Sequence, residues 1–125
     1  MQREDELKKI YMIERFLEMV FNSAISPATY RVLDFHVRKN HGKNITHLIW
    51  EDPKRAYDAI VAIMGGGELH ARALRKVLES YLEEVLGHPI NGELYEAIVK
   101  NDVEKVRQRL VELANEYMQV HLRRI

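Results

Sequence analysis

Three consecutive glycines, Gly65, Gly66 and Gly67, stand between two segments with helical apolar spacing. Backbone N–H groups at a helix start can hold an anion, and glycine lets that anion approach closely. The nucleotide-binding motifs that use this device are incomplete, because neither G-x-G-x-x-G nor G-x-x-x-x-G-K-[ST] occurs and no parallel strand precedes the turn. The glycines therefore predict a tight corner between two helices rather than a nucleotide loop.

The helix expected after the glycines carries its charges in an order that its own dipole opposes, at roughly 0.3 to 1 kcal/mol per charge. Such local conflicts are enriched at functional sites. The glycines and the basic start of this helix are therefore a candidate contact for an anion or a nucleic acid. Alternatively, the charges pair with one another, as Arg75 and Glu79 can at four residues' spacing, or with a neighbouring helix. The basic residues near the start are Arg72, Arg75 and Lys76, and the acidic residues toward the end are Glu79, Glu83 and Glu84.

The same segment has the outline of a helix-turn-helix, in which Arg72, Arg75 and Lys76 would contact DNA. Glu68 at the helix start and the acidic second half both repel phosphates. Nineteen basic and nineteen acidic residues also give zero net charge, so no global field attracts nucleic acid or an anionic membrane. Binding of nucleic acid or a phosphate ligand is therefore the less favoured alternative.

Metal binding has weak support from the histidines. His36, His41 and His47 are five and six residues apart, which matches no compact zinc spacing, and the chain lacks both cysteine and H-E-x-x-H. His70 is expected on an apolar helix face beside Leu74, as a hydrogen-bonded core or boundary residue. The sequence predicts no metal and no cofactor.

Catalysis would need a nucleophile beside a base, and no such pair is visible. Ser26 is expected to cap a helix, and neither Ser23 nor Ser80 lies in a G-x-S-x-G elbow. Carboxylates at helical spacing, such as Glu14 with Glu18, are typical of solvated faces. No catalytic residue is assigned, and the protein is predicted not to be an enzyme.

Helical spacing recurs along the whole chain, whereas strand alternation never lasts more than a few residues. Ser26-Pro27 and Asp52-Pro53 each predict a helix start, because the first residue can cap and proline suits the first helical position. Between those helices NITHLIW is expected to be a loop with one short turn. The chain thus predicts an all-α, single-domain bundle of about six helices, over about 4–24, 27–40, 53–64, 68–86, 93–100 and 103–124.

The last expected helix has an unusually wide apolar face, because Val111 and Leu122 belong to a second row beside its main one. A helix of this kind is usually clamped between two neighbours or lies partly in a dimer interface. The main row is the candidate interface and comprises Val106, Leu110, Leu113, Tyr117 and Val120.

Composition fits one soluble domain, since 46% of the 125 residues are hydrophobic and 30% are charged. The chain has no cysteine, so it offers neither disulfides nor thiolate chemistry. Neither a signal peptide nor a membrane-spanning run is visible, so we expect a cytoplasmic location and no membrane partner.

Three stretches, YRVLDFHVRKNHG, ITHLIWEDPKRAYDAIVAIMGGG and LHARALRKVLESYLEEVLG, together resemble the Nitrosopumilus output domain family, type five, over residues 30–87. The resemblance implies an all-α output module of archaeal signalling with no established enzymatic activity. The chain departs from the family pattern at Trp50, at its three glycines, and in an appended C-terminal helix hairpin over residues 91–125. We expect a regulatory or signalling-output domain that acts through association with a protein partner or as a homo-oligomer.

Overall fold

The computed structural model describes residues 2–123, and every regular element in that range is a helix. This confirms the all-α prediction, with one helix more than expected. The helices are α1 (Gln2–Ala24), α2 (Pro27–His41), α3 (Ile45–Glu51), α4 (Pro53–Met64), α5 (Gly67–Leu86), α6 (Glu93–Val99) and α7 (Val103–Arg123).

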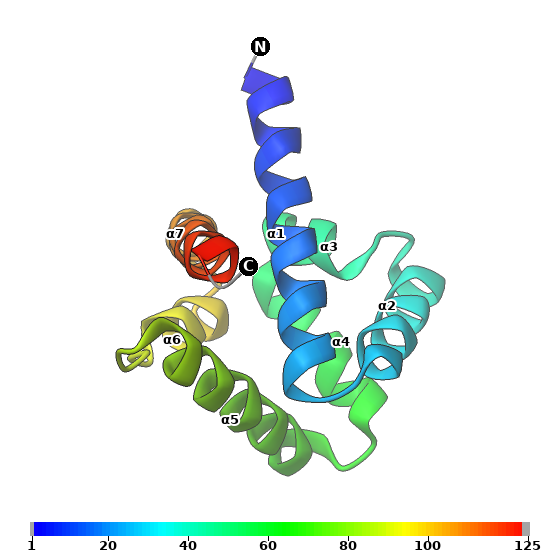
Figure 1. Ribbon diagram of the computed structural model, residues 1–125. Helices are drawn as coiled ribbons and strands as arrows, with labels where there is room; N and C mark the ends of the chain where they lie inside the picture. The colour runs from blue at the N-terminus through cyan, green and yellow to red at the C-terminus, as the bar shows by residue number, and fades with distance from the viewer. Residues whose placement is uncertain (1, 124–125) are drawn as a thin grey trace.

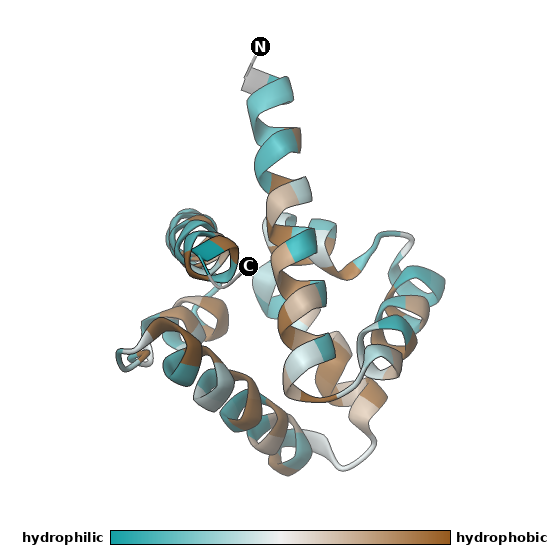
Figure 2. Ribbon diagram, in the orientation of Figure 1, coloured by the Kyte–Doolittle hydropathy of each residue, from teal (hydrophilic) through white to brown (hydrophobic). Residues whose placement is uncertain are grey.

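Helix α1 is the centre of the bundle (Figure 1), where it packs against α2, α3, α5 and α7. Its first turns extend beyond the other helices, and Figure 2 shows that hydrophilic residues dominate there. Leu7, in these turns, is consequently 53% exposed. Further along α1, Ile13 and Phe16 are fully buried, so this half of the helix positions the rest of the fold.

The predicted cap-and-proline starts are confirmed at both sites. The Ser26 side chain accepts a hydrogen bond from the Thr29 backbone N–H, and Asp52 accepts one from Arg55, with Pro27 and Pro53 following the caps. Each cap satisfies one of the free N–H groups at a helix start, which helps to fix where α2 and α4 begin.

The segment NITHLIW is a helix, α3, and the prediction of a loop was wrong. Asn44 caps it by accepting a hydrogen bond from the His47 N–H, and Ile45, Leu48 and Trp50 are buried. With only seven residues, α3 is too short to form an apolar stripe along several turns, so its stability comes from packing rather than from local propensity.

The core has two clusters of buried side chains. One lies among α1, α5, α6 and α7 and includes Trp50, and the other joins the end of α1 to α2, α3 and α4. Leu17 and Leu78 pack against both clusters and so connect them. In the part of the chain that the structure describes, no helix is long and apolar enough to cross a membrane.

Candidate functional site

The glycine turn forms a tight corner between α4 and α5. Gly65 and Gly67 have φ angles of 70° and 65°, a left-handed conformation that side chains with a Cβ rarely adopt. Gly66 lies beneath the His70 ring, where a Cβ would come within 1.9 Å of the ring Nδ1. His70 itself is exposed, so the prediction of a core or boundary histidine was wrong.

Arg75 is separated from the other basic residues of α5. Its guanidinium carbon lies 3.6 Å from the centroid of the Tyr95 ring, and its Nε is 3.2 Å from Glu79 Oε1. The alternative in which Arg75 pairs with Glu79 along the helix is thereby confirmed. Burial raises the pKa of the Glu79 carboxyl, and the positive charge of Arg75 opposes that shift. Arg72 and Lys76 remain exposed, so the three cations do not form one patch.

Glu68 places a carboxylate at the start of α5. It accepts hydrogen bonds from the hydroxyls of Tyr57 at 2.5 Å and Tyr95 at 3.4 Å. Burial first, and then the bond to Glu68, raise the pKa of the Tyr57 hydroxyl. This carboxylate suits the positive end of the helix dipole and repels a phosphate from the same position.

The inner face of α7 lies inside the chain, which corrects the candidate interface. Val106, Leu110, Leu113 and Tyr117 are at most 4% exposed, and Val120 is half-buried. These side chains pack against α1, α5 and α6, so the wide apolar face reflects several neighbouring helices rather than a partner chain.

Tyr117 is the largest of the fully buried side chains. Its ring and the Phe16 ring pack edge-to-face at a centroid distance of 5.4 Å, and its hydroxyl lies 2.8 Å from the hydroxyl of Tyr81. His70 and Tyr81 are eleven residues apart on one helix, or about 16 Å at 1.5 Å per residue. The structure therefore does not bring His70, Tyr81 and a carboxylate into one catalytic group.

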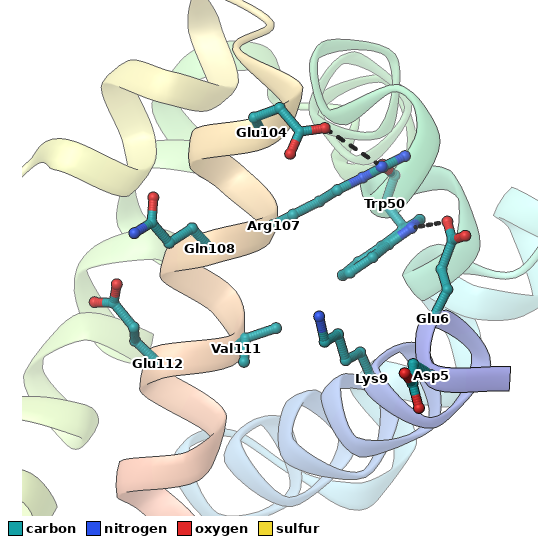
Figure 3. Close-up of a pocket in the computed structure, with 9 residues that line it drawn as sticks. All are labelled: Asp5, Glu6, Lys9, Trp50, Glu104, Arg107, Gln108, Val111 and Glu112. Carbon is teal, nitrogen blue, oxygen red and sulfur yellow. Dashed lines mark hydrogen bonds and ion pairs between the residues drawn. The ribbon is translucent and has the colours of Figure 1, made fainter. Parts of the chain in front are cut away.

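A groove of about 610 Å³ separates the start of α1 from α7 (Figure 3). The buried Trp50 indole forms part of its wall and donates a 2.6 Å hydrogen bond to Glu6. The guanidinium carbon of Arg107 lies 4.7 Å from the centroid of the indole ring, and its Nε donates a hydrogen bond to the Trp50 carbonyl. The Lys9 side chain points into the groove (Figure 3). No sequence pattern predicted this arrangement, because it joins residues from three distant segments. Trp50, Glu6, Arg107 and Glu104 contact one another through hydrogen bonds and an ion pair. Lys9, Asp5 and Gln108 also line the groove, and no hydrogen bond or ion pair is found for them within the described residues.

Six histidines do not assemble a metal site. Among residues 2–123 the structure contains no group of three or more histidine or acidic side chains that could hold a metal ion. His36, His41 and His47 instead lie on α2 and α3.

An exposed apolar stripe runs along the outer face of α5. Leu69 is 73% exposed and Val77 is 46% exposed, with the exposed Ala73 between them at four-residue steps. An open apolar groove of about 490 Å³ adjoins the stripe, and it is lined also by Ile25, directly after α1, and by Met64, at the end of α4. The buried side of α5 is centred elsewhere, on Ala71 and Leu82. This stripe and groove are the candidate association surface.

Charged residues flank the stripe in two opposite groups. Arg72 and Lys76 occupy the first half of α5, whereas Glu83 and Glu84 occupy the second half. Glu83 accepts a hydrogen bond from the Ile90 N–H. Within the described residues none of these four side chains makes an ion pair, since the pair of α5 is Arg75 with Glu79. The charges of Arg72, Lys76 and Glu84 are therefore free to meet a partner.

Comparison with protein-family models, curated proteins and solved structures finds no match to this chain. The resemblance of residues 30–87 to the Nitrosopumilus output domain family stays a prediction. The candidate function consequently rests on the geometry of α5 and its surroundings.

Proposed function

We propose that this protein is a non-catalytic, cytoplasmic regulatory module that self-associates through the outer face of α5. The observation that carries this proposal is the apolar stripe of Leu69, Ala73 and Val77, flanked by one basic and one acidic half. A signalling-output role, as the family resemblance implies, would require such an association surface.

A two-fold axis accounts for the reversed charges of α5. In a two-fold dimer the same patch faces itself, and where the two-fold axis passes near Val77 perpendicular to α5, the two α5 helices run antiparallel. Arg72 and Lys76 of one copy then approach the acidic second half of the other copy. The interaction of each charge with its own helix dipole is unfavourable by about 0.3 to 1 kcal/mol. An opposite charge across the interface offsets this cost.

The groove beside the stripe supplies the remaining contact area. A stable interface buries about 800 Å² on each partner, which is more than three side chains of one helix can offer. Ile25 and Met64 extend the apolar surface from α5 to the ends of α1 and α4. We therefore place the interface over the stripe and the groove together.

The first test is sedimentation velocity over a range of protein concentrations. Leu69→Asp and Val77→Asp should each shift the protein to monomer, because each puts a carboxylate in the centre of the apolar contact. Leu122→Asp is the matched control, since Leu122 is 68% exposed on another helix. A wild-type protein that stays monomeric at high micromolar concentration would refute self-association.

The second test exchanges the charges of the two halves of α5. Changing Arg72 and Lys76 to Glu, or Glu83 and Glu84 to Lys, should each weaken the dimer, and the four changes together should restore it. The bond from Glu83 to Ile90 is lost both in the Glu83/Glu84 variant and in the fourfold variant, so it cannot explain the restoration. If the fourfold variant dimerises no more tightly than the two double variants, the antiparallel arrangement is wrong.

Nucleic-acid binding remains the rival function, and the structure reduces its basis. Arg75 lies on Tyr95, which leaves only Arg72 and Lys76 exposed beside the acidic Glu68. Salt-dependent retention of the wild type on DNA or RNA, lost on neutralising Arg72 and Lys76, would favour this rival over self-association.

A further inference from the structure

A second apolar cavity, of about 180 Å³, lies among α4, α5 and α6, beneath the loop that precedes α6. Leu74 and Leu78 of α5, Ile90 of the loop and Leu94 of α6 form much of its wall, which is almost entirely apolar. A cavity of about 150 Å³ lined by such side chains can stay dry and bind benzene. The space is therefore sufficient for a small organic molecule.

Arg75 brings a positive charge to this apolar wall. Its Nε and Nη1 atoms are buried, and neither has a hydrogen-bond acceptor. Glu79 Oε1 is 3.2 Å from Nε, which suffices for an ion pair but does not give hydrogen-bond geometry. Since buried donors in proteins are nearly always hydrogen-bonded, these N–H groups are an exception that requires an explanation.

Stacking on Tyr95 does not supply the missing acceptor. The ring lies against the guanidinium at 3.6 Å from its central carbon. The N–H bonds of a guanidinium lie in its plane and need acceptors at its edge. The stacked ring therefore holds Arg75 in place and leaves its Nε and Nη1 donors without an acceptor.

We propose that the cavity binds a small organic monocarboxylate, whose apolar part fills the space and whose carboxylate accepts hydrogen bonds from Arg75. A carboxylate matches the paired N–H groups of arginine. A single negative charge suits the site better than a dianion, because Glu79 is adjacent. The cavity lies within one chain, so this site does not depend on self-association through α5.

Benzoate and hexanoate are suitable probes, and benzyl alcohol is the uncharged comparison for benzoate. Two-dimensional amide NMR should show saturable shifts around the cavity with both acids and weaker binding of the alcohol. Arg75→Met should weaken benzoate binding by about tenfold or more, the value of a hydrogen bond to a charged group, and leave the alcohol unchanged. Arg72→Met is the matched control, because Arg72 is on the same helix but exposed.

Ile90→Phe tests the location of the site, because it fills the cavity from a loop while keeping the backbone bond to Glu83. This variant should bind neither benzoate nor benzyl alcohol. Far-UV circular dichroism and thermal unfolding should be used to check that each variant is folded. Arg75→Lys keeps the charge but loses the paired N–H geometry, so it should bind benzoate with intermediate affinity.

Three results would overturn the proposal. The first is the absence of saturable shifts with either acid at millimolar concentration. The second is binding of benzyl alcohol as tight as that of benzoate, which would remove the role of Arg75 as the counter-ion. The third is benzoate binding that neither Arg75→Met nor Ile90→Phe changes, which would place the ligand elsewhere.

Discussion

Replacing Leu110 with alanine tests whether the inner face of α7 is core. Leu110 is 4% exposed and belongs to the cluster that joins α1, α5, α6 and α7. The change removes three carbons, worth about 0.8 kcal/mol each, and the cavity left behind brings the total to about 3 kcal/mol. At about 2.1 cal/mol/K for each residue, the entropy of unfolding is ~0.26 kcal/mol/K for this chain, so Tm should fall by about 11 °C.

Leu122→Ala is the matched control, since Leu122 is 68% exposed on the same helix. It should change the free energy of unfolding by less than about 0.5 kcal/mol. Urea unfolding can be followed by the fluorescence of Trp50, the one tryptophan of the chain. All proteins should be compared at one concentration, because association contributes to apparent stability.

Two outcomes would refute the assignment of α7 to the core. One is a loss of stability in Leu110→Ala no larger than that in Leu122→Ala. The other is a shift of Leu110→Ala from dimer to monomer in sedimentation with no change in the free energy of unfolding. The second result would show that the inner face of α7 lies in an interface between chains.

Three further predictions concern single contacts. Glu6→Ala removes the acceptor of the buried Trp50 N–H and should lower the free energy of unfolding by about 1 to 3 kcal/mol. Glu6→Gln keeps an acceptor and should lower it by less. Equal losses of the two variants in urea unfolding would contradict this prediction. Gly65→Ala should lower the free energy of unfolding by about 1 to 2 kcal/mol, because Gly65 has a left-handed φ. Gly65→Asn should lower it by less when both variants are compared by thermal unfolding. Equal losses would contradict the conformational explanation. The hydrogen bond to Glu116 raises the pKa of His88 above its ordinary 6.5, so its stabilisation is complete below 6.5 and is lost as pH rises through the folded pKa. The stability difference between the wild type and Glu116→Gln should therefore shrink over that range, and a difference independent of pH would refute it.

Local signals predicted most helix boundaries. Ser26 and Asp52 cap their helices through bonds to backbone groups three residues away, and Gly42 and Gly87 end α2 and α5 in the left-handed conformation. These signals depend only on neighbouring residues, so they can be read without the fold. Helix α3 was missed because a seven-residue helix provides too few turns for a periodic pattern.

The candidate sites were predicted less well, because each depends on which side of a helix is covered. The apolar pattern of α5 predicted an inward His70, yet His70 and Val77 are both exposed, and Ala71 is buried instead. The charge pattern predicted one basic patch, yet Arg75 lies on Tyr95, twenty residues further along the chain. A local sequence pattern cannot predict the position of a side chain from another helix.

The sequence by itself determined an all-α chain, its corners and most of its helix ends, because capping, glycine conformation and apolar periodicity act over a few residues. Only the tertiary structure decided that the wide face of α7 is core, that Arg75 borders a cavity, and that the stripe containing Leu69 faces outward. Those outcomes follow from how several helices exclude water together, and packing between distant segments is a property of the whole fold.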